Sequence, residues 1–386
     1  MSSFTYAVTI DGMDIAGMVL AGATITYGST ATGQAPAPTT AHLELLTVDA
    51  AGDLAADYPG ISWNGGIPSG YVDTFADSYE GATSSLEVGT PVVVRVGTET
   101  GYVDVFEANY RAGFDATRFT GQITALDYTP GLIGITAVDL AESLNRVELD
   151  PSSWPEESET ARVERILNAA GHGLARAQLI GSSSLVIRAG SYSRSATAWQ
   201  HLYLLALSCG SVVWVNRNGS LMYRTAGATP DTTYIAPPDA TLVDPLSMSS
   251  ELGDIVTDLE VKYGADAVLT ETSEAMSTYG RRDQRVEVEL KKTSDAQAFA
   301  DRQLARRAKP RWHMTSTTVH LGLADDDVAI AQLLNVDLDD VLELPYLLPA
   351  SPVTTYSSRV IGYTEQLDPY EWLIAYVLDP YGWEAP

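Results

Sequence analysis

RFTGQITALDYTPGLIGITAVDLAESLNR, residues 118–146, is the stretch around which the chain is organised. Alternate positions of its first part carry apolar or small residues, as one face of a strand does: Phe119, Gly121, Ile123 and Ala125. A turn is expected over 127–131, because Pro130 fixes φ and Gly131 adopts a positive φ without a Cβ clash. The stretch contains no catalytic signature, which favours a structural role.

The second half of this stretch predicts another strand and a short helix. Residues 132–138 are apolar enough for a strand that pairs with the first. Asp139 is expected to cap the following helical turn, with Glu142 three residues later as its capping-box partner. A strand, a turn, a strand and a closing helix therefore form the nucleus of the first domain.

Length and composition set wide limits on the chain. Its 386 residues suggest two to four domains at the usual domain size. No apolar run approaches the roughly 20 residues needed to cross a bilayer, and the segment MSSFTYAVTIDG lacks the basic and apolar regions of a secretory signal. Cys209 is the single cysteine, which excludes an internal disulfide and the usual cysteine zinc sites, and fits folding in a reducing cytoplasm.

The chain is strongly acidic, with a formal net charge of -27. Such a charge promotes solubility, and it repels nucleic-acid phosphates, so a DNA or RNA reader is not expected. A surface past which DNA slides without sticking would carry this sign. Composition alone leaves open whether the charge serves solubility or a channel.

Alternating segments predict a mainly β first domain over residues 1–147, a closed or nearly closed antiparallel barrel. Its strands are expected at 4–10, 23–28, 41–48, 91–97, 101–110 and within the opening stretch. Residues 49–88 are rich in Gly, Ala, Asp, Ser and Tyr with little periodicity. We interpret them as a long excursion that contacts a neighbouring subunit, and we expect its deletion to weaken assembly while the domain still folds.

The sequence period changes after Asp150, and residues 151–226 predict a small α+β domain. Amphipathic helices are expected at 158–171 and 195–208, each followed by a glycine. The segment SVVWVNRNGSLMYR follows, and Asn218-Gly219 between apolar runs predicts a β-hairpin.

Two further domains are predicted at 245–322 (α+β) and 323–386 (β). The first combines strands at 255–264, 285–291 and 315–321 with a helix that begins at a Ser294–Gln297 capping box and ends before Pro310. The second contains three strands, within 341–349, 357–367 and 371–379. The fold class is therefore mainly β with α+β insertions, in several domains.

Carboxylates and histidines give no recognisable catalytic or metal pattern. Asp325, Asp326 and Asp327, with Asp337, Asp339 and Asp340, could ligate a hard cation such as Ca²⁺, but the spacing favours a solvated loop. The histidines are scattered, His313 and His320 are expected on opposite faces of one strand, and a structural role is expected for each: His42, His172, His201, His313 and His320. We expect no catalytic, cofactor or metal site.

Arginines and C-terminal aromatics are the other candidate binding residues. Arg281-Arg282 and Arg306-Arg307 resemble a basic patch, and we expect them to pair with carboxylates of a neighbouring subunit. The C-terminal aromatic residues suit either a sugar platform or an interface or core position, and the second is favoured. They are Tyr370, Trp372, Tyr376, Tyr381 and Trp383.

In their order along the chain, these elements resemble the hub proteins of bacteriophage tail tips and baseplates, the minor tail proteins of siphophage-like particles. Four segments carry the resemblance: FTGQITALDYTPGLIGITAVDLAESLNR with Asp139 and Leu144, SCGSVVWVNRNGSLMYR, IVTDLEVKYG, and RVIGYTEQLDPYEWLIAYVLDP. The long excursion at 49–88 departs from the family pattern.

The resemblance implies a non-enzymatic virion component at the tail tip, assembled in the host cytoplasm. In that family, the N-terminal and C-terminal β-barrel-like domains of three copies alternate in a pseudo-sixfold ring that continues the tail tube. It implies a homotrimer that connects tube to tip and passes DNA during ejection without binding it specifically. The implied partners are tube proteins above, tip or receptor-binding proteins below and the tape-measure protein, with wall-degrading modules on other proteins.

Two other function classes are kept as alternatives. A host-surface carbohydrate-binding tail module would present a concave aromatic site on an exposed loop. An enzyme such as a glycoside hydrolase would need a cleft with two carboxylates about 5 to 10 Å apart and at different pKa values. The absent motifs argue against the enzyme.

Overall fold

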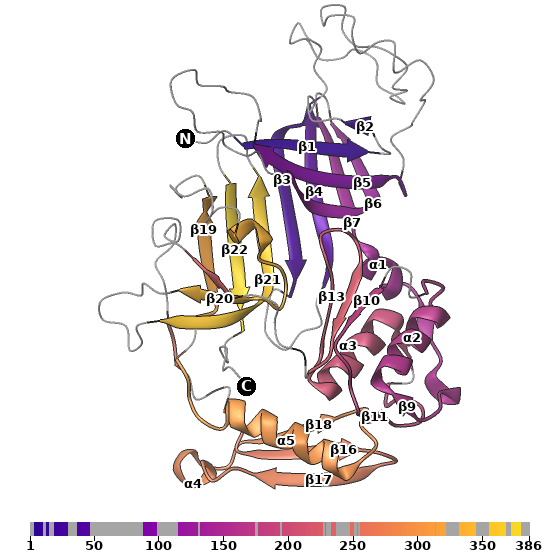
Figure 1. Ribbon diagram of the computed structural model, residues 1–386, viewed down its shortest axis with the longest axis vertical. Coiled ribbons are helices and arrows are strands. Elements are labelled where there is room, and N and C mark those ends of the chain that lie inside the picture. The colour runs from indigo at the N-terminus through magenta and orange to yellow at the C-terminus, as the bar shows by residue number, and fades with distance from the viewer. Residues whose placement is uncertain are drawn as a thin grey trace, which may run out of the picture. The chain divides into compact units, whose positions relative to one another are not determined.

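The structure is a computed structural model (Figure 1). It describes residues 4–10, 13–14, 19–29, 37–46, 88–98, 115–129, 132–173, 177–193, 195–226, 228, 233–236, 248–250, 253, 255–312, 314–321, 332–344, 355–367 and 372–379. The chain divides into two compact units. Unit 1 comprises Met1–Thr26, Thr39–Asp139 and Thr364–Leu373, and unit 2 comprises Tyr27–Pro38, Leu140–Tyr363 and Ile374–Pro386.

Unit 1 is built on an antiparallel sheet in the order β3-β4-β7-β6-β5-β1-β2. Its strands are β1 (Phe4–Ile10), β2 (Met13–Asp14), β3 (Val19–Gly28), β4 (Ala37–Leu46), β5 (Pro91–Thr98), β6 (Asp115–Thr129) and β7 (Leu132–Val138). Alternate positions of the central strands are buried, including Ile25, Leu43, Val94 and Ile135. The expected strand pair of the opening stretch is therefore present as β6 and β7.

The expected closed barrel is wrong for the described residues, because the strand order that contains β3 to β2 does not close on itself. The mainly β, multi-domain fold class with α+β insertions is confirmed. The predicted excursion at 49–88 and the predicted strand at 101–110 lie outside the described residues, except for the excursion's last residue, Val88.

Two β-bulges interrupt the alternation of β6. Val94 pairs with Phe119 and Arg95 pairs with Thr117, so Arg118 is the extra residue that the register skips. The second register shift lies between Ile123 and Ala125. A bulge redirects side chains and strengthens the local twist. Here both Arg118 and its neighbour Phe119 are buried, which simple alternation does not predict.

Gly121 is required by the close packing around it. A Cβ at this position would lie 2.3 Å from Val138 O and 2.4 Å from Phe119 Cζ. The Phe119 ring therefore occupies the space above the glycine, and the aromatic-x-Gly spacing of the opening stretch has a packing reason.

Unit 2 begins with a small α+β region. It contains α1 (Leu140–Asn145), β8 (Glu148–Leu149), a 3-10 turn (Pro151–Ser153), β9 (Glu157–Ser158), α2 (Glu159–Ala169), β10 (Ala177–Ile180), β11 (Val186–Ile187), β12 (Ala196–Thr197), α3 (Ala198–Cys209), β13 (Val212–Val215) and β14 (Leu221–Arg224). Strands β10, β14 and β13 form one sheet, and the other strands pair as β11-β9 and β12-β8. Both predicted helices are present as α2 and α3.

Local sequence explains where α3 begins and ends. Thr197 and Gln200 form a capping box, with Gln200 N–H donating to Thr197 Oγ1 at 3.2 Å and Thr197 N–H donating to Gln200 Oε1 at 3.1 Å. Gly210 ends the helix in the left-handed conformation, with φ of 75°.

The hairpin that follows is confirmed, with a loop longer than two residues. Asn216 Oδ1 accepts from Asn218 N–H and Ser220 N–H, and Gly219 has φ of 75°. The loop therefore runs from Asn216 to Ser220 and places Arg217 at its tip.

The rest of unit 2 combines a helix-covered sheet with a group of C-terminal strands. Its elements are β15 (Thr233–Ile235), β16 (Asp258–Tyr263), β17 (Ala267–Thr272), α4 (Met276–Tyr279), β18 (Asp283–Glu287), α5 (Thr293–Arg307), β19 (Ser316–His320) and β20 (Val341–Leu344), with most of β21 (Tyr356–Leu367) and β22 (Trp372–Leu378). The end of β21 and the start of β22, Thr364–Leu373, belong to unit 1. Helix α5 lies along the sheet β17-β16-β18 (Figure 1). Strands β15, β20 and β21 are neighbours, and β22 pairs with β21 and β19.

The expected capping box at Ser294 and Gln297 is wrong. Lys292 is the N-cap of α5, and it makes no side-chain cap hydrogen bond. Ser294 Oγ donates to Asp295, and the Gln297 amide donates to Glu271 and Asp301. The helix therefore begins two residues earlier than expected, and the Gln297 side chain binds carboxylates instead of capping the helix.

One hydrophobic cluster extends from Ala141 to Leu304 and contains residues from both predicted α+β domains, 151–226 and 245–322. Among its buried members are Trp199, Leu205, Leu259 and Phe299. The division into four domains remains a prediction. None of the described helices is both long and apolar enough to cross a membrane.

Candidate functional site: a buried arginine network

Arg217, at the tip of the β13–β14 hairpin, is almost completely buried. Its Nε donates to the hydroxyl of Tyr363 at 2.9 Å, and its two terminal nitrogens donate to the carbonyl oxygens of Leu334 and Val336. The guanidinium also lies over the Tyr363 ring, 5.3 Å from the centroid. Arg217 therefore binds this segment through its planar fork of donors.

Arg224, at the end of β14, forms a second contact with the C-terminal strands. Its Nε donates to Asp339 Oδ2 at 2.7 Å, and its Nη2 donates to the Asp339 carbonyl oxygen at 2.7 Å. Arg359 on β21 donates to Asp339 Oδ1 at 3.0 Å, and Asp339 itself is 5% exposed. Burial raises the pKa of Asp339, while Arg359 and Arg224 oppose this change.

Asp337 and Asp340 complete the loop before β20. Asp337 Oδ1 accepts from the Tyr363 hydroxyl at 3.2 Å and from Leu338 N–H, and Asp340 Oδ2 accepts from Asp337 N–H at 2.8 Å. Burial raises the pKa of Asp340 from 3.8 to about 7, with the Asp337 hydrogen bond opposing the shift. Its ionisation therefore falls near neutral pH.

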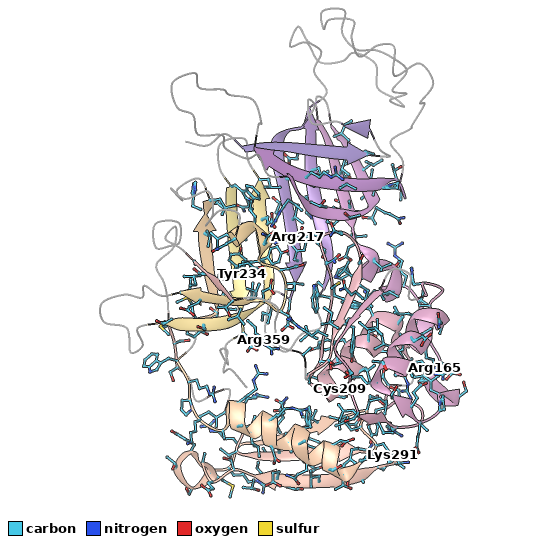
Figure 2. All side chains as sticks on the ribbon, viewed as in Figure 1. Arg165, Cys209, Arg217, Tyr234, Lys291 and Arg359 are labelled. Atoms are coloured by element: carbon cyan, nitrogen blue, oxygen red, sulfur yellow. The ribbon has the colours of Figure 1, made fainter. Side chains whose placement is uncertain are left out.

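We call this set the buried arginine network: Arg217, Arg224, Arg359, Asp337, Asp339, Asp340 and Tyr363. Figure 2 labels Arg217 and Arg359 within unit 2. The contacts of Arg217 and Arg224 join the β13–β14 hairpin to β21 and to the loop before β20, and the remaining contacts lie within this loop or join it to β21. These contacts fix the positions of the strands relative to one another.

Unit 1 has a corresponding buried pair. Arg118, the bulge residue of β6, donates from Nε to Glu365 Oε2 at 2.9 Å, and its Nη2 also binds the carboxylate. Both side chains are 0% exposed. The guanidinium lies over the Trp372 ring, 5.6 Å from its centroid. A two-pronged Arg–carboxylate pair of this kind is strongly directional.

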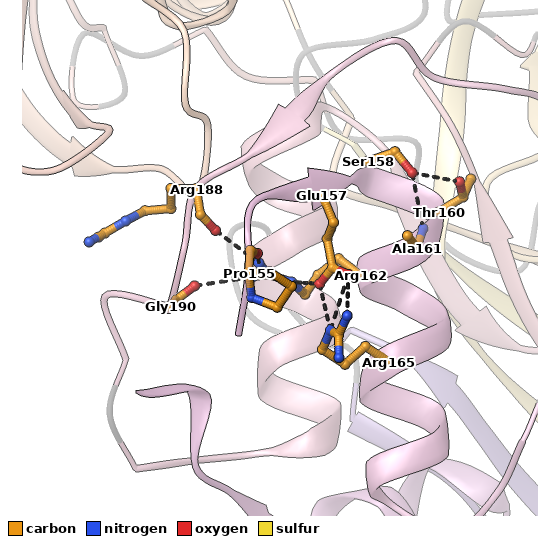
Figure 3. A network of polar contacts seen from close by, with 9 residues as sticks. All are labelled: Pro155, Glu157, Ser158, Thr160, Ala161, Arg162, Arg165, Arg188 and Gly190. Carbon is orange, nitrogen blue, oxygen red and sulfur yellow. Dashed lines mark hydrogen bonds and ion pairs between the residues drawn. The ribbon is translucent and has the colours of Figure 1, made fainter. Parts of the chain in front are cut away.

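A third arginine cluster lies at the start of α2 (Figure 3). Arg162 donates to Glu157 at 2.7 Å and to three carbonyl oxygens, those of Pro155, Arg188 and Gly190. Arg165 also donates to Glu157. Burial raises the pKa of Glu157, but the hydrogen bonds from Arg165 and Arg162 outweigh burial and hold it below its usual value.

The single cysteine lies in a closed polar cluster. Cys209 is fully buried, and Glu159 accepts hydrogen bonds from Ser211 and from the Tyr223 hydroxyl. Burial and the neighbouring Glu159 raise the pKa of the Cys209 thiol well above its ordinary value. A thiol needs a lowered pKa and access to act as a nucleophile, so this cluster is structural.

The acidic residues at 325–327 and 337–340 were expected in solvated loops rather than in a cation site. Asp325, Asp326 and Asp327 lie outside the described residues, and the expected solvated loop is wrong for Asp339, which is buried against two arginines. In the described part of the chain, no group of three or more His, Cys, Asp or Glu side chains is arranged to hold a metal ion.

The histidines lie in separate places. His42 contacts Thr136, and His172 contacts Ser143. His201 is buried with its ring 4.9 Å from that of Trp154, and burial lowers the pKa of its imidazole. His320 is at the end of β19, and His313 lies outside the described residues.

Two of the predicted C-terminal aromatics belong to the cores of the units. Trp372 is 1% exposed, and Tyr376 is buried with its hydroxyl donating to Leu333 O at 3.0 Å. Neither ring is available as a sugar platform. Tyr370, Tyr381 and Trp383 lie outside the described residues.

The sequence singled out Asp337, Asp339 and Asp340 of the buried arginine network but not its arginines, although one signal was present. Arg224 ends the apolar run LMY, and Arg118 begins the strand RFTGQI. A charged residue in a buried strand needs a partner, because an unpaired buried charge is very costly. That argument indicates burial of a pair, but it does not identify the partner.

Comparison with solved structures gives the same fold in three tail proteins. The tail protein from Neisseria meningitidis MC58 has a TM-score of 0.62 and 11% identity, with 99% of this chain and 98% of that chain covered. The 43 kDa tail protein of prophage MuSo2 from Shewanella oneidensis has a TM-score of 0.58 and 12% identity, with 97% and 98% covered.

The third is prophage tail protein gp18 from Listeria monocytogenes EGD-e, with a TM-score of 0.54, 12% identity, and 97% and 95% covered. No protein-family model and no curated protein sequence matches the chain. The resemblance to bacteriophage tail proteins indicated by the motifs is therefore confirmed at the level of the fold.

Proposed function

We propose that this chain is a structural component of a virion tail, the hub of a tail tip or baseplate. The observation that supports the proposal most is the fold shared with three tail proteins over at least 97% of this chain and at least 95% of theirs. Agreement over whole chains indicates a shared architecture of several parts, whereas a common superfold would match one domain only.

The assembly we propose is a homotrimeric ring that connects the tail tube to the tip. A ring of three copies with two β regions each offers six related docking positions to a tube of sixfold symmetry. Tube proteins would bind above and tip or receptor-binding proteins below, and the tape-measure protein is a further candidate partner.

DNA passage is proposed on the basis of charge. A net charge of -27 repels phosphates, so DNA would move through the ring without specific binding. The proposal includes no enzymatic step. The absence of an enzymatic step from the proposal is supported by burial, because the Cys209 thiol and the Glu159 carboxylate are not exposed to solvent.

The native mass of the purified chain tests the proposal. The expected result is a trimer, or a ring formed on addition of tail extract. A chain that stays monomeric at high concentration with and without extract would contradict the hub. If that monomer also retained glycans on an array, the carbohydrate-binding alternative would replace it.

A further inference from the structure

The two double-arginine segments of unit 2 lie side by side. Thr257 N–H and Asp258 N–H donate to the carbonyl oxygen of Arg282, at 3.0 and 3.2 Å, and the preceding residue, Val256, donates to Arg307 O at 3.0 Å. Three consecutive residues before and at the start of β16 therefore bridge the end of α5 to the start of β18. Arg307 also donates to Gln284 on β18 at 2.6 Å.

These contacts gather basic side chains from two sequence regions. We call them the basic patch, which comprises Arg281, Arg282, Arg306, Arg307, Lys309 and Arg311. Carboxylates of the same chain bind two of its members: Asp258 accepts from Arg281 at 2.7 Å, and Asp379 accepts from Arg306 at 2.6 Å. Arg281 and Arg306 thus have carboxylate partners within the chain, whereas the sequence analysis expected partners on a neighbouring subunit.

Two members of the patch expose their basic side chains to solvent. Lys309 is exposed, and the Arg281 side chain is 69% exposed although paired. An accessible positive region on a chain of charge -27 is complementary to most of the remaining surface.

Trp312 adds an apolar anchor at the end of the same segment, RRAKPRW. It is 49% exposed, the one tryptophan with a large exposed fraction among the described residues. Tryptophan and arginine are enriched at the energetic centres of protein interfaces, and the large ring loses water-exposed area on docking. Charge and apolar surface therefore coincide at one place.

We propose that the basic patch and Trp312 dock onto an acidic surface of a second copy of this chain. The inference rests on the proposed function, since a ring of identical copies brings different surfaces of neighbours together. Charge complementarity favours a second copy over nucleic acid, because the whole chain repels phosphates while its own acidic surface attracts the patch.

Sedimentation velocity over a concentration series tests this proposal with the full chain. Trp312→Ala and Lys309→Glu are each expected to raise the concentration at the midpoint of assembly by about tenfold or more. Raising the salt from about 50 to about 300 mM is expected to shift the wild-type midpoint in the same direction and to shift Lys309→Glu less.

Matched controls separate the patch from general effects of charge and exposure. Leu207→Ala removes a 40% exposed apolar side chain, and Arg146→Glu makes the same charge change as Lys309→Glu at a side chain that is 67% exposed. Both controls are expected to assemble within about twofold of wild type.

If wild type is oligomeric and both patch variants assemble at the same midpoint concentration as wild type, this inference is overturned. The proposed hub function would still stand in that case. A wild type that stays monomeric would contradict both. Binding of a fluorescent single-stranded oligonucleotide by wild type, lost in Lys309→Glu, would assign the patch to nucleic acid and overturn the second copy as its occupant.

Discussion

The buried arginine network and the basic patch use the same residue type in opposite ways. In the network, Arg217 and Arg224 are enclosed, and each guanidinium is held by acceptors of the same chain. In the patch, Arg281 and Lys309 are exposed. Burial makes each contact strong and each lost partner costly, whereas water screens the exposed charges.

Because of this difference, substitutions in the two regions should change different properties of the protein, folding for the network and association for the patch. Changes in the network should affect folding, because a buried charge without its partner is severely destabilising. Changes in the patch should affect association and leave folding alone, because exposed ion pairs contribute about 0 to 1 kcal/mol.

The largest effect is expected for Arg224→Met. The substitution leaves the buried Asp339 carboxylate with Arg359 as its remaining arginine, and we expect a loss of about 3 to 5 kcal/mol in the free energy of unfolding. Chemical denaturation followed by circular dichroism measures it. The double variant Arg224→Met/Asp339→Asn removes the charge and should recover part of the loss, and a double variant as unstable as the single one would refute this reasoning.

A smaller effect is expected for Arg217→Lys. Lysine keeps the charge but lacks the planar fork that binds Leu334 O, Val336 O and the Tyr363 hydroxyl together. We expect destabilisation of about 2 kcal/mol in the same denaturation experiment. Stability equal to wild type would mean that charge, rather than donor geometry, matters at this position.

A pH-dependent effect is expected for Asp340→Asn. The folded-state pKa of about 7 exceeds the ordinary value of 3.8, so the folded chain holds a proton that the unfolded chain lacks between these values. The contribution of Asp340 to stability therefore falls as the pH rises from about 4 to about 7.

Asparagine does not ionise and keeps an oxygen acceptor for Asp337 N–H. The Tm of Asp340→Asn relative to wild type should therefore rise by several degrees between pH 4.5 and 7.5. Thermal unfolding at both pH values measures the difference. An identical difference at the two values would show that Asp340 does not titrate in this range.

The smallest effect on folding is expected in the basic patch. Trp312→Ala and Lys309→Glu should change the free energy of unfolding by no more than about 0.5 kcal/mol, because both side chains are exposed. Denaturation of the monomer at low concentration measures it. A loss of unfolding free energy comparable to that of Arg224→Met would show that Trp312 stabilises the fold, and the two regions would then no longer differ.

The sequence predicted the elements that depend on local pattern. Alternation indicated β6 and β7, helical periodicity indicated α2 and α3, and Asn218-Gly219 indicated the hairpin. The predicted N-cap at Ser294 was wrong, because α5 begins at Thr293 and Ser294 lies within its first turn.

Long-range pairing was beyond sequence reasoning. Arg118 and Glu365 are 247 positions apart, and their contact depends on a bulge set by the register of β5 against β6. Asp339 and Arg224 form a similar long-range pair, 115 positions apart in the sequence. The pattern predicts that such residues need partners, but topology decides which partner is near.

Image reconstruction of the purified oligomer without imposed symmetry tests the central claim most directly. We expect a ring of three copies around an open channel wide enough for DNA. A closed particle without a channel, or a chain that remains a single copy in every image class, would contradict a tail hub.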